Sequence, residues 1–306
     1  MKVGVVFPQT EIGSDPGAVR EFAEAAEALG YDHLLTFDHV VGADTNHYRD
    51  WGGAYRLEDQ FHEPFVLFGY LAAITQRLEL VTGILILPQR QTTLVAKQAA
   101  AIDVLSGGRL RLGVGIGWNA VEYEALGEDF SNRGRRSEEQ ASLLRELWTQ
   151  NSVNFEGRWH RVQHAGLRPM PVQQPIPIWF GGGAEAVMKR IGRVGDGWIA
   201  STRDVEGEGS FENRVKQIKK YTKEAGRDPE KIGVEAFVVA GKGSPEEWAQ
   251  EAAQWVKRGA THVSINTMKS GFNSPQKHID AIRRFKEALR SRRTRRNVRL
   301  STEVRE

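Results

Sequence analysis

Hydrophobic positions along this 306-residue chain follow two patterns that alternate from one end to the other. Short apolar runs rich in β-branched residues are typical of strands buried on both faces. Between them lie longer segments whose apolar residues recur every three or four positions, as on one face of a helix. The short runs predict eight strands, at residues 2–7, 33–37, 80–87, 109–114, 178–180, 197–200, 232–240 and 262–266.

The helical segments carry their own start and stop signals. Asp15-Pro16 opens the first one, Gly30 closes it, and Phe22 lies on its apolar face. Gly107-Gly108 ends a second helical segment at 92–105. Because each helix separates two strands, the pattern predicts repeated β-α-β units with parallel strands.

Glycines gather at the carboxyl ends of the third and fourth predicted strands. Gly83 lies in the third strand, and Gly113, Gly115 and Gly117 lie in or just after the fourth. Glycine weakens the interior of a strand, so such a cluster indicates a bulge or a ligand pressed against the backbone. Ligands of α/β proteins bind at this end of parallel strands. The stretch 78–119 is therefore the candidate floor of a cofactor site.

Eight strands alternating with helices predict a (β/α)8 TIM barrel with inserted loops, as one domain over residues 1–290. A doubly wound open sheet is the alternative. The insertions are a hairpin at 153–162, a proline-rich spacer at 169–177, a polar loop at 201–210 and a long connection at 40–63. A connection as long as the last is usually functional, so we expect it to cover a site.

Composition removes several classes of chemistry. The chain has no cysteine, which excludes disulfides, thiolate nucleophiles and cysteine-bound metals. No apolar run reaches the length of a membrane span, and residues 1–9 carry no signal pattern. We therefore expect a soluble, cytoplasmic protein that does not act at a membrane.

Positive charge is concentrated at the carboxyl end. Residues 290–306 contain seven Arg and two Glu, a net charge of +5, so residues 1–289 carry about −2 of the formal +3. We expect 291–306 to be a disordered, solvated basic tail. The alternative, an electrostatic contact with nucleic acid, is not favoured.

Two motifs could carry chemistry. Asp38-His39 follows the second strand, where a barrel places active-site groups, and a histidine there can shuttle a proton. A structural histidine is the alternative. Gly181-Gly182-Gly183 precedes a helix whose free N–H groups could hold a phosphate, although tight turns also need glycine.

Metal-dependent and acyl-transfer chemistry are not expected. His39, His47 and His62 are close in sequence, but no HExxH motif or paired carboxylates accompany them. The chain also lacks the GxSxG elbow of serine hydrolases. No metal ligand is therefore assigned.

Several segments together resemble the luciferase-like monooxygenase superfamily, and more narrowly its F420-dependent oxidoreductases. The most specific of them is LSGGRLRLGVGIGW, and the basic tail lies outside the match. The matching segments are TFDHV (36–40), FHEPF (61–65), LVTGILILPQR (80–90), AKQAAAIDVLSGGRLRLGVGIGWN (96–119), RGRR (133–136), PIWFGGGAEA (177–186) and IGRVGDGW (191–198).

The resemblance implies a barrel that binds a flavin or a 5-deazaflavin at the carboxyl ends of its strands. In such proteins a bulge with a non-prolyl cis peptide lies behind the tricyclic ring, and Gly83-Ile84 matches it. Asp38 and His39 would lie beside the ring, with His39 as the proton shuttle. Glycines 115 and 117 would allow close approach by the cofactor.

The resemblance also implies a site for the phosphate-bearing arm of the cofactor. Gly181, Gly182, Gly183 and the start of the following helix would bind the phosphate, and Trp198 would pack on the far side of the cofactor. Dimers are common in this superfamily, so we expect a homodimer that acts on a small molecule.

Trp118 departs from the pattern of relatives that oxidise alcohols and sugar phosphates, which carry an acidic residue at this position. Because an indole ring cannot deliver a proton, the resemblance favours a reductase that passes hydride from coenzyme F420 to an activated C=C, C=N or C=O bond. The alternative is a monooxygenase that uses reduced FMN and oxygen.

Overall fold

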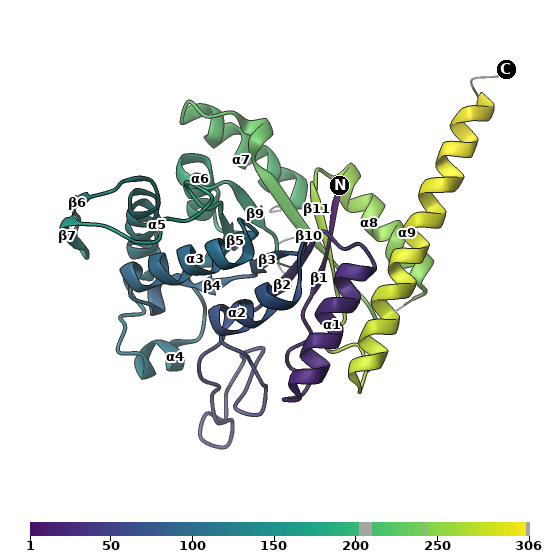
Figure 1. The fold of residues 1–306 in the computed structure, drawn as a ribbon, viewed down its shortest axis with the longest axis horizontal. Helices are drawn as coiled ribbons and strands as arrows, with labels where there is room; N and C mark the ends of the chain where they lie inside the picture. The colour runs from purple at the N-terminus through teal and green to yellow at the C-terminus, as the bar shows by residue number, and fades with distance from the viewer. Residues whose placement is uncertain (202–209, 242, 304–306) are drawn as a thin grey trace.

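The computed structural model describes residues 1–201, 210–241 and 243–303, with side chains described as far as residue 292. Most of the polar loop predicted at 201–210 lies outside the described residues. Figure 1 shows strands at the centre of the molecule and helices around them.

Parallel strands close into a barrel. Each neighbouring pair is parallel, in the order β3-β2-β1-β11-β10-β9-β8-β5-β4, and a further pairing of β3 with β5 joins the two ends. This closure confirms the (β/α)8 barrel and rules out the doubly wound sheet. The strands are β1 (Lys2–Val6), β2 (His33–Thr36), β3 (Glu79–Thr82), β4 (Leu85–Ile86), β5 (Leu110–Gly115), β8 (Ile178–Gly181), β9 (Gly197–Ile199), β10 (Gly233–Val239) and β11 (His262–Asn266).

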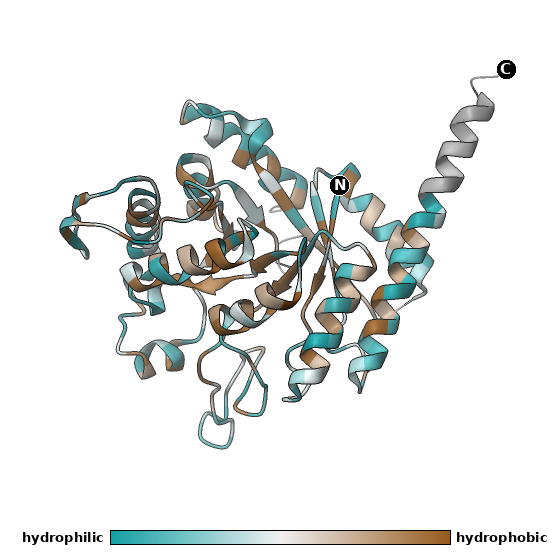
Figure 2. Cartoon of the chain, viewed as in Figure 1, coloured by the Kyte–Doolittle hydropathy of each residue, from teal (hydrophilic) through white to brown (hydrophobic). Residues whose placement is uncertain are grey.

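Helices surround the barrel, and the hydropathy colours in Figure 2 show mostly hydrophobic strands at the centre and helices in which hydrophobic and hydrophilic residues are mixed. They are α1 (Pro16–Ala28), α2 (Pro64–Ile74), α3 (Thr92–Ser106), α4 (Ala120–Ala125), α5 (Arg133–Thr149), α6 (Glu185–Val194), α7 (Phe211–Glu224), α8 (Pro245–Lys257) and α9 (Pro275–Glu303). The predicted hairpin is present as the antiparallel pair β6 (Val153–Glu156) and β7 (Arg161–Ala165).

Two elements differ from the prediction. The third strand is not continuous over 80–87, because β3 and β4 are separated at Gly83-Ile84, where the peptide bond is cis as the resemblance implies. Helix α9 continues to Glu303, so the tail predicted to be disordered is helical over most of its length. No glycine or proline follows Pro275, and nothing in the sequence stops the helix at 290. Figure 1 shows its last turns extending beyond the barrel.

An ionic network fills the interior of the barrel at the amino ends of the strands. The buried carboxylate of Glu235 lies 2.8 Å from Arg111 Nη1 and 2.7 Å from His33 Nε2, and it accepts a bond from Ser264 Oγ at 2.6 Å. Burial would raise the pKa of Glu235, but His33 and Arg111 together hold it far below its usual range. With this end filled, the open end of the barrel is the carboxyl end.

Candidate active site

A cleft of about 420 Å³ lies at the carboxyl ends of the strands, within the size range of small-molecule sites. Most of its lining comes from glycine backbone, aliphatic side chains and aromatic rings. The lining residues are Phe37, Tyr55, Gly83, Ile84, Gly115, Ile116, Gly117, Trp118, Gly181, Gly182, Ile199, Ala200, Ser201, Phe237 and Asn266. The predicted glycines of β5, the bulge and the turn after β8 are thus brought to one place.

The glycines around the cleft make room for the bulged third strand. A Cβ at Gly115 would come 2.1 Å from Ile84 Cδ1, and one at Gly181 would come 2.8 Å from Ile84 Cγ2. Gly117 has φ of +64°, and a Cβ there would meet Ile86 at 2.8 Å. The immediate neighbours of these glycines are therefore isoleucines of the protein. A ligand would meet Ile84 as well as bare backbone.

Asp38 is placed behind the cleft rather than in it. Its side chain is fully buried and accepts bonds from Arg90 Nη2 at 2.8 Å and from the Ile86 amide at 2.9 Å. Burial raises the pKa of Asp38, and the Arg90 guanidinium opposes that rise. Arg90 Nη1 also donates to Glu63 at 2.8 Å. Asp38 therefore holds the segment after the bulge in position and ties it to the start of α2.

His39 is held by a carboxylate that the sequence analysis missed. Its Nδ1 lies 3.3 Å from Glu122 Oε2, and the other Glu122 oxygen accepts from the Val40 amide. Gln89 Nε2 donates to Glu122 at 3.2 Å. Burial favours the neutral acid, but the bonds from His39 and Val40 outweigh it and lower the pKa of Glu122. Because a carboxylate only accepts, Nδ1 carries the proton of this contact and Nε2 is left to exchange protons.

Aromatic rings enclose His39. The ring centroids of Tyr55, Phe61 and Trp118 lie 5.0, 4.9 and 5.7 Å from the imidazole. Tyr55 and Phe61 belong to the long connection at 40–63, and Tyr55 lines the cleft. This connection therefore lies against the site, which is where its length led us to expect it.

Of the residues predicted to bind the phosphate-bearing arm, only part of the triple glycine lines the cleft, and Trp198 does not. Gly181 and Gly182 line the cleft, whereas Gly183 lies outside it and accepts a bond from Arg214 Nε at 2.9 Å. Trp198 is fully buried, packs on Phe211 at 5.3 Å and donates through Nε1 to the Gly182 carbonyl at 2.9 Å. Trp198 thus supports the glycine turn from the helix side and does not line the cleft.

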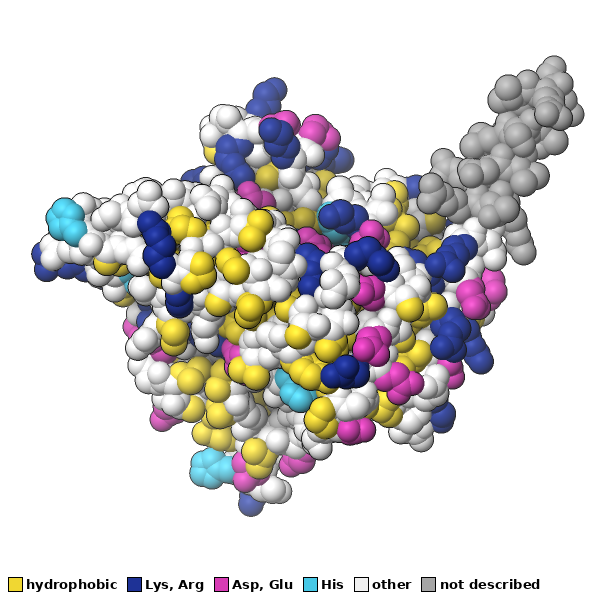
Figure 3. All heavy atoms as spheres, in the orientation of Figure 1, with side chains coloured by type: hydrophobic (Ala, Val, Ile, Leu, Met, Phe, Trp, Pro, Cys, Tyr) yellow, Lys and Arg dark blue, Asp and Glu magenta, His cyan; other side chains and the backbone are white. Residues whose placement is uncertain are grey.

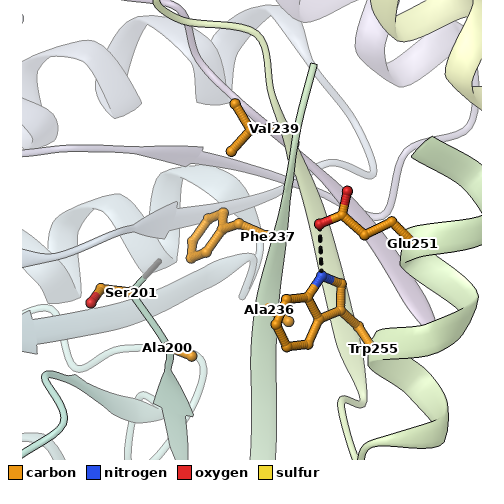
Figure 4. Close-up of a pocket in the computed structure, with 7 residues that line it drawn as sticks. All are labelled: Ala200, Ser201, Ala236, Phe237, Val239, Glu251 and Trp255. Carbon is orange, nitrogen blue, oxygen red and sulfur yellow. Dashed lines mark hydrogen bonds between the residues drawn. The ribbon is translucent and has the colours of Figure 1, made fainter. Parts of the chain in front are cut away.

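A smaller cavity of about 130 Å³ adjoins the cleft and shares Ala200, Ser201 and Phe237 with it. Figure 4 shows that Glu251 and Trp255 reach it from α8, joined by a hydrogen bond of 3.2 Å from Trp255 Nε1. Burial raises the pKa of Glu251. Among the described residues, no group of three or more His, Asp or Glu side chains could hold a metal ion, and no helix is long and apolar enough to cross a membrane.

The profile of the luciferase-like monooxygenase family matches residues 1–303, and the chain belongs to this family. An FMNH2-dependent dimethylsulfone monooxygenase of Pseudomonas putida is 32% identical over 269 residues, which covers 86% of this chain and 67% of that protein.

Solved structures show the same fold. The monooxygenase RslO1 of Streptomyces bottropensis superposes with a TM-score of 0.79 at 19% identity, covering 95% of this chain and 99% of that one. An F420-dependent secondary alcohol dehydrogenase, solved with an F420–acetone adduct, superposes with a TM-score of 0.77 at 18% identity, covering 94% and 98%. Members of the fold thus use different redox cofactors.

Proposed function

We propose that this protein is an F420-dependent oxidoreductase that reduces an activated C=C, C=N or C=O bond of a small molecule. The observation that carries the proposal is the position of His39. Its imidazole is held by Glu122 and is not itself a lining residue, but it lies 5.0 and 5.7 Å from the rings of Tyr55 and Trp118, which line the cleft together with Gly83 and Ile84. A reduction by hydride also needs a proton, and this histidine is placed to provide it.

The residues of the cleft fit a flat redox cofactor. Ile84 and Ile199 offer an apolar face, and the backbone of Gly181 and Gly182 leaves space for the arm. Helix α6 starts next to this turn, and its N-cap residue, Ala184, has no side-chain oxygen to occupy the free N–H groups. These amides would bind the phosphate, as proposed from the sequence. When bound, a reduced deazaflavin supplies hydride to the substrate.

The protein's own part is to orient the partners and to move a proton. Glu122 holds His39 through Nδ1, and Nε2 would pass a proton to the substrate atom next to the one that receives hydride. The surrounding rings of Tyr55 and Trp118 exclude water from that transfer. Trp118 has no acidic group, which supports reduction over alcohol oxidation.

Titration of the purified protein with F420 and, separately, with FMN tests the choice of cofactor. We expect F420 to bind in the micromolar range or tighter, and its reduced form to be consumed when an enone, imine or aldehyde is added. Tight binding of FMN with no binding of F420 would contradict the proposal.

An FMN-dependent monooxygenase is the second candidate, and the Pseudomonas putida relative favours it. It would use the same cleft with reduced FMN and oxygen. Oxygen consumption that depends on reduced FMN and a sulfone or other small substrate would support it. The same assay with reduced F420 under nitrogen separates the two candidates, because only the reductase turns over without oxygen.

We also propose that the protein is a homodimer. Val66 on α2 and Leu94 and Leu105 on α3 have exposed fractions of 74%, 52% and 69%. Figure 3 shows hydrophobic side chains over the face where these helices lie. An apolar surface of this kind is a common site of contact between copies of a chain.

A further inference from the structure

We propose that the substrate is an uncharged molecule with an aromatic or similarly flat, conjugated face, and that Trp118 and Tyr55 bind this face. The inference rests on the proposed function, because it takes the substrate to lie between the cofactor ring and the connection at 40–63. It adds the chemical class of the substrate and the side chains that select it.

The first observation is the arrangement of rings around the proton donor. Tyr55 and Trp118 both line the cleft, and both lie within 6 Å of the His39 ring, at 5.0 and 5.7 Å. They come from distant parts of the chain, one from the connection after β2 and one from the segment after β5. A molecule whose reacting atom reaches His39 must therefore lie against at least one aromatic ring.

The second observation is that Trp118 is exposed yet held in place. Its exposed fraction is 41%, although tryptophan is usually well buried. The Trp51 ring lies 5.6 Å from it, and a Cβ on Gly53 would come within 2.4 Å of its ring atoms. The connection therefore packs directly on one part of the indole and leaves another part open. A fixed, open ring is a preformed stacking surface that loses little entropy on binding.

The third observation is that the described part of the lining is uncharged. None of the described lining residues carries a charged side chain. The carboxylates of Asp38 and Glu122 are buried behind the cleft and already bonded to protein groups. Lys269, whose Nζ lies 4.7 Å from the Tyr55 centroid, is not a lining residue and donates to the Ala54 carbonyl. Among the described lining residues a charged substrate would find no ionic partner to offset the loss of its hydration.

The polar groups of the lining suit a neutral carbonyl. The side-chain oxygen of Asn266 accepts from the Met268 amide at 2.9 Å, so its NH2 group is the part that can donate to a ligand. A carbonyl conjugated with a ring and a C=C bond would satisfy this donor and the aromatic surface together. Aryl enones are therefore the probes of choice.

The test compares three ligands on protein loaded with oxidised F420. Benzylideneacetone is neutral and aromatic, its para-carboxylate is charged, and ethylideneacetone lacks the ring. We expect benzylideneacetone to bind about 10-fold more tightly than either of the others, from fluorescence titration and from KM in the reduction. Equal affinity for the three ligands, or a preference for the carboxylate, would overturn the inference.

Variants then assign the preference to Trp118. Trp118→Ala should lower the preference for benzylideneacetone over ethylideneacetone, taken as the ratio of their dissociation constants, about 3- to 10-fold, whereas Trp118→Phe should keep most of the preference. Leu57→Ala, at an exposed position of the same connection, is the matched control. If Trp118→Ala weakens F420 as much as the aryl ketone, the ring serves the cofactor and the inference is wrong.

The two proposals fail separately. If wild-type protein does not bind F420, the proposed function is wrong, and the same three ligands are titrated against protein loaded with FMN. Discrimination between aromatic and non-aromatic ligands on that protein would still support the aromatic site, and its absence would refute it.

Discussion

At the scale of single residues, the pairing of His39 with Glu122 is the central feature of the site. The two are 83 positions apart in the chain, and no local pattern relates them. A signal was nevertheless available, because Glu122 lies in the first turn of α4, which follows the carboxyl end of the fourth predicted strand, where barrel active sites gather. For Asp38 the sequence predicted the position but not the surroundings. Its position after a strand was read correctly, but its burial with Arg90 depends on a contact between segments 52 positions apart.

Replacement of Glu122 by Gln tests this pairing. A neutral amide holds the His39 Nδ1–H less strongly than a carboxylate does, so the ring loses its orientation and we expect kcat for reduction to fall at least about 10-fold with a small change in KM. Glu124→Gln, at an exposed position of the same helix, is the control and should leave kcat and KM unchanged. A Glu122→Gln enzyme with unchanged kcat would show that the carboxylate only anchors the segment after His39.

Among the elements, the closure between β3 and β5 depends on Gly113. A Cβ there would lie 2.0 Å from the Thr82 carbonyl oxygen, which is backbone and cannot rotate away. We expect Gly113→Ala to lower the free energy of unfolding by about 2–4 kcal/mol, because β3 must shift to relieve the clash. Urea unfolding measures the loss. Gly134→Ala, where a Cβ would meet open space, should cost nothing or stabilise α5. Equal stability of the two variants would contradict this reading of Gly113.

The regular elements were largely predictable because their signals are local. Apolar runs, the Asp15-Pro16 start and the Gly107 stop each fix an element within a few residues, and strands and helices appear where those signals place them. The split of the third strand could not be read from its apolar run. Gly83 indicated a bulge or a close ligand, and the resemblance placed a cis peptide at Gly83-Ile84. The length of α9 was missed because high charge was read as disorder, although the segment contains no helix-breaking residue.

For the whole molecule, buried histidines make stability dependent on pH. Burial, together with Arg111, lowers the pKa of His262 to about 3, and burial lowers that of His278 to about 4. Unfolded histidines titrate near 6.5, so below that pH the unfolded chain binds protons that the folded chain does not. The free energy of unfolding should therefore fall as the pH drops from about 6.5 to about 4, by about 2–3 kcal/mol for each histidine.

Urea unfolding at pH values between about 7.5 and about 4.5 measures this dependence. Thr267 Oγ1 lies 2.8 Å from His278 Nδ1. The variant His278→Gln keeps a polar side chain beside this hydroxyl but has no group that titrates between about pH 4 and about pH 7. We expect this variant to take up about one proton fewer on unfolding near pH 5 than the wild type. If the two proteins show the same slope, His278 does not contribute to the acid sensitivity.

The exposed apolar residues of α2 and α3 support the proposed homodimer. Leu94 and Leu105 lie on one helix and are more than half exposed, which costs free energy in water unless another surface covers them. A second copy offers the same surface across a two-fold axis, so one interface would bury the exposed leucines of both copies.

We expect light scattering to give twice the chain mass of 34.3 kDa for the wild type and the chain mass itself for Leu94→Glu/Leu105→Glu. Leu57→Glu, equally exposed but in the connection at 40–63, should remain dimeric. A wild type that is monomeric at micromolar concentration would refute the dimer. A double variant that stays dimeric would place the interface on another face.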